Sequence, residues 1–164
     1  MQRMRVLAIF CLLLTALTGC VSVNIGPKKP GRAENIRAQA PEGAFASVKD
    51  TSADQAWQSQ KTGNTISYLS ECPEPQMSLE SLTNETLAVL REREVVKQDT
   101  KFFNARAALE TVATGTLDGI AMKTQSLVFK RNGCSYMITY TARAVNFDEE
   151  VASYRRFLEG FQAP

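Results

Sequence analysis

The residues of this chain that can do chemistry are few, because it contains four cysteines and no histidine. The absence of histidine excludes serine and cysteine hydrolase triads, imidazole metal sites and histidine pH switches. The cysteines form no Cys-x-x-Cys pair, so a thiol redox enzyme is not indicated. Chemistry carried by carboxylates or lysines stays open.

Carboxylates gather at two places in the sequence. Asp148-Glu149-Glu150 could bind a hard cation, but the same residues suit the start of a helix, where negative charge matches the helix dipole. Glu71 and Glu74 flank Cys72 in a proline-rich turn, and without a known separation they do not define a glycosidase pair. No glycine-rich phosphate loop or metal-ligand spacing is present. We therefore predict no catalytic residue, no metal and no cofactor.

The first twenty residues have the pattern of a bacterial export signal. Arg3 and Arg5 lead into Val6–Leu17, a run that is almost wholly apolar. Its length suits the core of a signal peptide and falls short of the ~20 residues that a membrane-spanning helix needs. The run closes in Leu17-Thr18-Gly19-Cys20, which resembles the bacterial lipobox. The resemblance implies that residues 1–19 are removed as a signal peptide and that Cys20 is acylated.

An acylated Cys20 would place the protein in the cell envelope, held to the membrane by its N-terminal lipid. One fatty chain binds a membrane only marginally, whereas the three chains of the lipoprotein family would anchor it permanently. Val21 and Ser22 stand where inner-membrane members of that family often carry aspartate. The resemblance therefore implies the outer membrane, with the domain facing the periplasm. The alternative interpretation is a standard secretory signal in which Cys20 is incidental.

Export leaves Cys72 and Cys134 as the two cysteines of the mature domain, because Cys11 leaves with the leader. In an oxidising compartment we predict a disulfide between them, and two buried free thiols are the alternative. A bridge that closes a loop of about 60 residues would add roughly 4 kcal/mol in the chain-entropy model, less any strain.

The mature chain has the size of one domain on a tether. Without Arg3 and Arg5 it carries 17 basic and 17 acidic residues, so nucleic-acid binding, which needs a concentrated basic surface, gains no support. Residues 20–43 hold the acylated cysteine and a stretch rich in proline, glycine and charge, which we interpret as a flexible tether spanning about 25 Å. Residues 44–164 form the predicted domain.

The domain shows short strands, two helices and a run of longer strands. Short strands are predicted over Ala44–Lys49 and Thr65–Leu69, with a polar segment between them that carries Trp57. Apolar residues spaced by three and four predict helices over Ser78–Arg93 and Asp148–Glu159. Three strand-like runs, separated by Asp-Gly and Asn-Gly turns, predict an antiparallel meander over Ala105–Thr116, Ile120–Lys130 and Cys134–Ala144.

In the last of these runs Tyr136, Ile138 and Tyr140 alternate with residues that face the other way, so one face is expected to be buried. A helix with an apolar stripe needs a sheet or another helix to cover that stripe. The predicted fold class is therefore α+β, an antiparallel sheet packed by two main helices.

The order of elements from about Ala44 to Phe161 resembles the PsbP-like α/β/α sandwich. The resemblance lies in a mid-chain helix before an Arg106-Ala107-Ala108-Leu109 strand, a long hairpin, Gly133-Cys134-Ser135-Tyr136, and a closing helix that ends in Phe157-Leu158-Glu159-Gly160-Phe161. Members of that group are often small exported lipoproteins or extrinsic subunits of membrane complexes, and they are typically not enzymes. The pattern is mainly hydrophobic, and it transfers no functional residue to this chain.

Two functions remain open on these grounds. One is a non-enzymatic accessory or scaffold subunit of an envelope assembly, which acts by contact with a protein partner. The other is a binding module for a small or lipidic ligand, with a pocket between sheet and helices near Trp57, Tyr136 or Tyr140. A concave apolar pocket at these side chains would favour the second function, and a solid core there would count against it.

Overall fold

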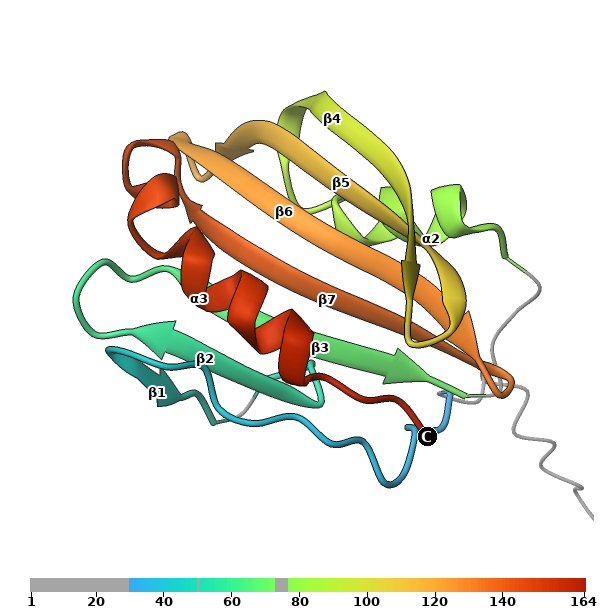
Figure 1. Cartoon of the computed structure of the whole chain (residues 1–164). Coiled ribbons are helices and arrows are strands. Elements are labelled where there is room, and N and C mark those ends of the chain that lie inside the picture. The colour runs from blue at the N-terminus through green and yellow to red at the C-terminus, as the bar shows by residue number, and fades with distance from the viewer. Residues whose placement is uncertain (1–29, 50, 73–76) are drawn as a thin grey trace, which may run out of the picture.

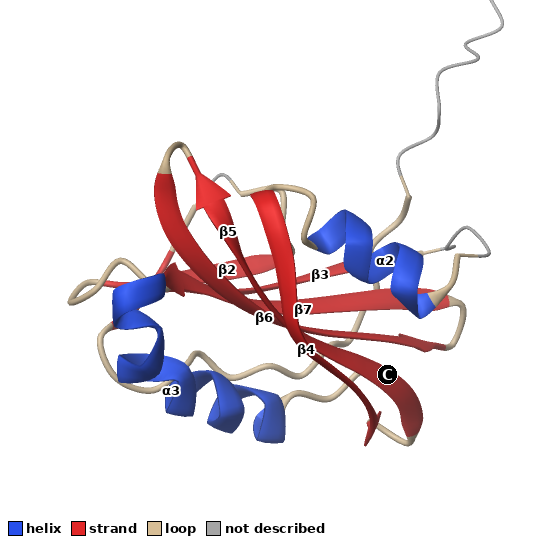
Figure 2. Cartoon of the chain, turned by 90° about the horizontal axis from the view of Figure 1, so that it is seen from above, coloured by secondary structure: helices blue, strands red, loops and turns tan. Residues whose placement is uncertain are grey.

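The computed structural model describes residues 30–49, 51–72 and 77–164, which form one antiparallel sheet with a helix on each face (Figures 1 and 2). The strand order is β1-β2-β3-β7-β6-β5-β4. The strands are β1 (Phe45–Ser47), β2 (Gln55–Ser59), β3 (Thr65–Glu71), β4 (Arg91–Phe103), β5 (Arg106–Leu117), β6 (Ile120–Arg131) and β7 (Cys134–Arg143). The helices are α2 (Leu79–Thr86) and α3 (Phe147–Gly160), and a short 3₁₀ turn, η2 (Ala144–Asn146), precedes α3. The predicted α+β fold with two packing helices is confirmed.

Tight turns set the register of the β5–β6–β7 meander. Asp118 and Gly119 have φ values of 51° and 78°, and Asn132 and Gly133 have 51° and 73°. Two successive residues with positive φ match the right-handed twist of a hairpin, and Asp-Gly and Asn-Gly adopt that geometry at little cost. The meander predicted from these dipeptides is confirmed.

The two faces of the sheet carry separate cores. Side chains of β7 alternate, so that Tyr136, Ile138 and Tyr140 point to α3 while Met137 packs with Leu82 of α2. Helix α3 closes the larger core with the apolar stripe expected of it, and the buried hydroxyl of Tyr154 donates to the carbonyl oxygen of Ile138 at 3.1 Å. Each such buried side chain contributes about 1.5–3 kcal/mol through its apolar area. The smaller α2 face is left partly open.

Helix α2 is shorter than predicted. Ser78 caps it as expected, because its hydroxyl accepts from the N–H of Ser81 at 3.1 Å. The helix ends at Thr86, whereas the apolar spacing predicted that it would continue to Arg93. Leu90, which suggested the extra turn, is buried in the loop beyond the helix against Leu87 and Ala113. The prediction was wrong because a buried loop residue matched the helical spacing.

Strands β2 and β4 were not predicted. Strand β2 contains Trp57 within the segment interpreted as polar, and β4 spans a stretch with no clear apolar alternation. β4 forms the free edge of the sheet and is exposed over nearly its whole length. Its many charged residues and its two register irregularities between Arg91 and Lys97 are typical of an edge that resists pairing with other chains.

Part of the predicted tether is packed against the domain. Residues 31–38, which we call the strap, carry Ala33, Ile36 and Ala38 against the larger core. The N–H of Cys72 donates to the carbonyl of Gly31 at 2.7 Å, where any Cβ at residue 31 would lie 2.6 Å from the carbonyl oxygen of Cys72. The interpretation of residues 20–43 as a flexible tether is therefore wrong for the strap, because its small apolar side chains and free backbone groups find partners on the sheet.

Cys72 and Cys134 form the predicted disulfide, with their Cα atoms 4.5 Å apart. The bridge joins the end of β3 to the start of β7, two neighbouring strands whose pairing it extends.

The leader, the lipobox-like residues and Cys20 lie outside the described residues. Among the residues that are described, no helix is long and apolar enough to cross a membrane.

Candidate functional site

The three aromatic residues predicted to contact a ligand lie in the core. Trp57 is 6% exposed, Tyr136 and Tyr140 are fully buried, and none of the three lines a hollow described below. The Trp57 ring packs edge-on against Phe157 with 5.4 Å between ring centroids. The predicted pocket at these side chains is corrected to a solid core, because α3 places its own aromatic residues where a ligand would enter.

The buried tyrosine hydroxyls have structural roles or none. The Tyr140 hydroxyl donates to the carbonyl of Phe147 at 2.8 Å, and burial, reinforced by the negative charge of Glu150, raises the pKa of this tyrosine. Burial is also the main cause that raises the pKa of Tyr136. The Tyr136 hydroxyl has no hydrogen-bond partner among the described residues. These groups stay protonated at neutral pH.

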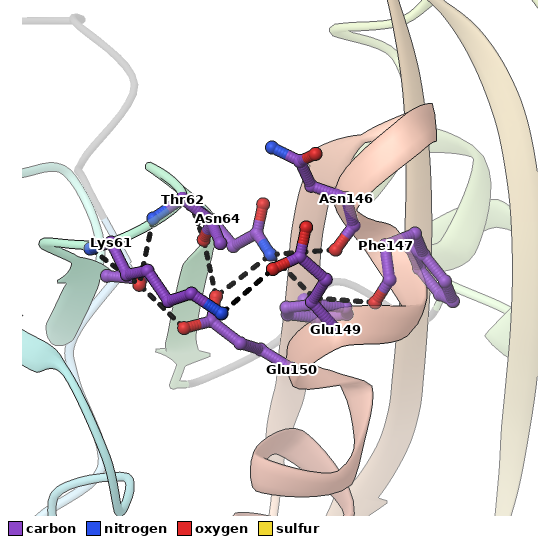
Figure 3. A network of polar contacts seen from close by, with 9 residues as sticks. Lys61, Thr62, Asn64, Asn146, Phe147, Glu149 and Glu150 are labelled. Carbon is purple, nitrogen blue, oxygen red and sulfur yellow. Dashed lines mark hydrogen bonds and ion pairs between the residues drawn. The ribbon is translucent and has the colours of Figure 1, made fainter.

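The acidic cluster at the start of α3 ties two elements together (Figure 3). The Glu150 carboxylate accepts from Ser59 Oγ at 2.7 Å, from Asn64 Nδ2 at 2.9 Å and from Thr62 Oγ1. Lys61 pairs with the neighbouring Glu149 at 3.0 Å. The donors all come from the end of β2 and the turn into β3, so the cluster fastens that turn to the first turn of α3. This arrangement is the helix start that was weighed against a cation site.

A hollow of about 880 Å³ lies between the strap and the loop before β2. Three charged residues line it, Glu71 and the two opposite charges Arg32 and Asp54, which pair with each other at 3.3 Å. Arg32 also donates to the carbonyl of Ser70 at 2.7 Å. These groups hold the strap on the sheet, so they are already engaged and the hollow is a weak candidate for ligand recognition.

A second hollow has a different character, and we call it the α3 groove. It runs between α3 and the three strands β4, β5 and β6, and it comprises two adjoining hollows of about 560 and 300 Å³. Both hollows are open to solvent and share lining residues at their junction. The polar half is lined by the basic residues Lys97, Lys101, Lys123 and Arg155 and by the acidic residues Glu110, Asp148 and Glu159, and the apolar half by Phe102, Phe103, Leu127, Leu158 and Phe161.

Strand alternation explains why charged side chains reach this groove. On β5, Glu110 lies between Ala108 and Val112, the residues two positions away that share its face. On the paired β6, Lys123 and Gln125 occupy the same face as the core residue Leu127. Helix α3 contacts β7 and does not extend over the β4 side of the sheet, so these inward-facing positions line an open groove (Figure 2).

The charges of the polar half are held in place by neighbours. Glu110, whose side chain is 11% exposed, forms an ion pair with Lys101 and accepts from Gln125 Nε2 at 2.9 Å. Lys97 pairs with Asp99 at 2.9 Å, and this hydrogen-bonded partner raises the pKa of the Lys97 ammonium. The ammonium of Lys123 lies over the ring of Phe147, 4.3 Å from its centroid. The polar half therefore presents a mixed set of positioned charges, in which Lys97 and Lys101 are paired with carboxylates.

The apolar half lies toward the C-terminal end of α3. Phe103 packs edge-on against Phe129 at 5.2 Å and Phe161 is buried, so this part of the floor is rigid. Phe102 stands out because 81% of its surface is exposed. Sequence reasoning missed the whole groove. The signal that could have revealed it is a charged residue two positions along a strand from a core residue, because such a residue lies on the same face of the sheet as the core.

Comparisons with known proteins identify the fold of the chain. No family model matches the chain, and no curated protein matches its sequence. Among solved structures, cyanobacterial PsbP (CyanoP) from Synechocystis superposes with a TM-score of 0.58 at 11% identity, over 90% of this chain and 99% of that one. LpqN from Mycobacterium tuberculosis, described as involved in cell envelope biogenesis, gives 0.61 at 11% identity, over 86% and 88%. The chain has the PsbP-like α+β fold that the sequence pattern resembled.

Proposed function

We propose that this protein is a lipid-anchored envelope protein that faces the periplasm and acts by binding a protein partner, without catalysis. The leader of residues 1–19 and the lipobox-like sequence that ends in Cys20 motivate the lipid anchor, and Val21 and Ser22 motivate the outer-membrane location. The disulfide between Cys72 and Cys134 supports an oxidising compartment, because such bonds persist mainly outside the cytoplasm. The shared fold with LpqN, a protein described as involved in envelope biogenesis, is compatible with this role.

The observation that carries the binding role is the α3 groove. Basic and acidic side chains and the exposed ring of Phe102 occur side by side in two adjoining open hollows. Protein interfaces are enriched in aromatic and arginine side chains, and a charged rim gives specificity and orientation. Phe102 and Arg155 supply such residues at the groove. An accessory subunit that acts by contact would present this surface to its partner.

Site-specific photocrosslinking in cells tests the contact. A photoreactive amino acid at Arg155, which is exposed and lines the groove, is expected to give one or more reproducible adducts with an envelope protein. The same group at Glu85, an exposed residue on the opposite helix α2, is the matched control. Equal adducts at both positions, or none at Arg155, would contradict the groove as a contact surface.

The intact mass of protein purified from membranes tests the anchor separately. The expected mass is that of Cys20–Pro164 plus an acylated diacylglyceryl group, with Cys72 and Cys134 alkylated only after reduction. A mass without lipid would exclude the anchor and leave the groove to be judged by crosslinking alone.

A second candidate function follows from the division of the groove into a polar and an apolar half. An amphiphile with an anionic head and a short apolar tail would match both halves, with Lys123 and Arg155 at the head and Leu158 near the tail. Binding of a fluorescent anionic fatty acid is expected to weaken in Leu158→Gln and to persist in Val145→Thr, a change at an exposed site outside the groove. No saturable binding would remove this candidate.

A further inference from the structure

At one end of the sheet lie Gly31, near the start of the described chain, the tips of two hairpins, and the C-terminal residues (Figure 1). We call it the hairpin end and define it by Gly31, the β4–β5 tip (Phe102–Arg106), the β6–β7 tip (Arg131–Gly133) and residues 162–164. Direct contacts connect these parts. They run from Gly31 to Cys72, across the disulfide to Cys134, to its cross-strand partner Arg131, and from Arg131 to the carbonyl of Asn104 at 2.6 Å.

The C-terminal residues complete this end. The carbonyl of Pro164 accepts from Arg131 Nε at 2.7 Å and from Asn132 Nδ2 at 2.8 Å. The backbone of Gln162 pairs with that of Arg37 in both directions, at 3.0 and 2.8 Å. The hairpin end is therefore cross-connected, and its backbone is held in place relative to the strap.

The strap limits how far this end can lie from a lipid on Cys20. Because the chain is docked from Gly31 onward, only about ten residues separate Cys20 from the domain. Even a fully extended chain of that length spans no more than about 35 Å, at 3.3–3.6 Å per residue. An anchor at Cys20 would therefore hold the hairpin end near the membrane.

The exposed side chains at this end suit an anionic lipid surface. Phe102 is 81% exposed at the β4–β5 tip, with Ala105 and Arg106 exposed beside it. Arg37 and Arg131 line a polar hollow of about 550 Å³ against the C-terminal residues. Aromatic side chains favour the membrane interface, and basic residues near an anionic leaflet are attracted to it.

Acidic residues lie near these arginines. Glu34 of the strap and Glu71 at the end of β3 stand against Arg37, Arg106 and Arg131, and Glu159 lines the hollow that contains Phe102, so the attraction to an anionic leaflet depends on the exposed Arg37 and Arg106. Arg32 is neutralised by its ion pair with Asp54.

We infer that the hairpin end docks on the anionic surface of the membrane that holds the anchor, with Phe102 inserted at the interface and the exposed Arg37 and Arg106 on lipid phosphates. The inference rests on the proposed lipid anchor for its geometry, but the surface itself can be tested without lipid on the protein. Docking in this way would turn the apolar half of the α3 groove, which shares Phe102, toward the lipid.

Vesicle sedimentation of the mature chain with Cys20→Ser is the test. Binding is expected on phosphatidylglycerol-containing vesicles, to fall as salt rises, and to be weak on pure phosphatidylcholine. Arg106→Gln is expected to weaken binding roughly fivefold, at about 1 kcal/mol for each basic residue near the surface. Phe102→Thr is expected to weaken it by about tenfold through lost apolar burial.

Matched controls lie at the far end of the sheet. Arg91→Gln removes a charge at the other end of β4, about 40 Å away at 3.3 Å per residue. Val145→Thr removes an exposed apolar group that follows the far end of β7. Both controls should bind like the parent chain. The four side chains are exposed, so folding is expected to persist, and circular dichroism checks it.

Phe102→Trp in the acylated chain gives a second readout. Brominated lipids are expected to quench the new tryptophan, while Trp57, at 6% exposure, remains unquenched. No binding to anionic vesicles, equal effects of tip and control variants, or equal binding to phosphatidylcholine would overturn the inference. An unlipidated mass combined with tip-dependent binding would refute the anchor and keep the docking surface.

Discussion

Replacement of Glu150 by alanine is the most informative single test of how this fold holds together. Its carboxylate accepts from three side chains of the β2–β3 connection, Ser59, Thr62 and Asn64. A hydrogen bond to a charged group contributes about 1.5–3 kcal/mol, and a buried donor left without its acceptor adds a desolvation cost. Asn64 is 1% exposed, so water cannot replace the carboxylate there without rearrangement.

The expected loss for Glu150→Ala is about 2–4 kcal/mol. Ser59 and Thr62 can recover part of the cost by bonding to water in the opened space, and the Asn64 amide keeps Tyr140 Oη at 2.9 Å and the carbonyl of Asn146 at 3.2 Å. For a domain of this size the loss corresponds to a fall in Tm of about 4–16 °C, at 2–4 °C per kcal/mol.

Glu149→Ala is the matched control, because it removes the same charge from the same turn of α3. Its partner is Lys61, and the two side chains are 43% and 68% exposed. Exposed pairs contribute about 0–1 kcal/mol. Both variants lose a similar interaction with the helix dipole, about 0.3–1 kcal/mol, so this contribution cancels in the comparison.

Urea unfolding followed by Trp57 fluorescence, with the disulfide intact, measures both variants. The reasoning predicts a lower midpoint for Glu150→Ala with an unchanged m value. Stabilities of the two variants that agree within about 0.5 kcal/mol would refute the view that this carboxylate fastens the turn to α3. A strong coupling between Glu150→Ala and Asn64→Ala would confirm which donor carries the effect.

Three further results are expected. Reduction of the Cys72–Cys134 bridge, which spans 62 positions in sequence, should cost roughly 4 kcal/mol in the chain-entropy model, measured as a shift of the urea midpoint with and without reductant. Leu82→Ala should cost about 2–4 kcal/mol, because Leu82 lies on the buried face of α2, and hydrogen exchange should show its largest increase in that helix. Tyrosinate absorbance at 295 nm should stay absent as pH passes 10 and appear only together with unfolding. Burial raises the pKa of every tyrosine in the chain, so folding favours the neutral phenols, and the stability they contribute is present below pH 10 and is lost as pH rises beyond it. A gradual appearance of phenolate in folded protein would contradict this last expectation.

The sequence predicted the parts of the fold in which the two faces of a strand carry different side chains. Strand β7 places Tyr136, Ile138 and Tyr140 on the face that meets the large α3 core, and its other face carries Met137 and two threonines. The turns were readable for a separate reason, since positive φ restricts the residues that a tight hairpin can use.

Strand β4 was missed because nothing covers it. An edge strand exposed on both faces needs no apolar period, so its sequence is free to carry charge, and the pattern that identifies other strands is absent. The strap was missed for a related reason. Its contacts depend on three small side chains and on backbone hydrogen bonds, and backbone groups leave no mark on the sequence.

The site itself depends on a relation that no local pattern contains. Aromatic residues attracted the prediction of ligand contact, yet in a small domain large aromatic side chains are the main source of buried apolar area, and here Trp57 and the tyrosines serve that purpose. Glu110, in contrast, is a charged residue at a strand position that faces the same side as the core. A carboxylate on the same strand face as Ala108 must either pay desolvation or meet partners, and it meets Lys101 and Gln125 only because β4 and β6 flank β5. Inward-facing charge on strands, rather than aromatic content, is therefore the feature that separates the α3 groove of this fold from its core.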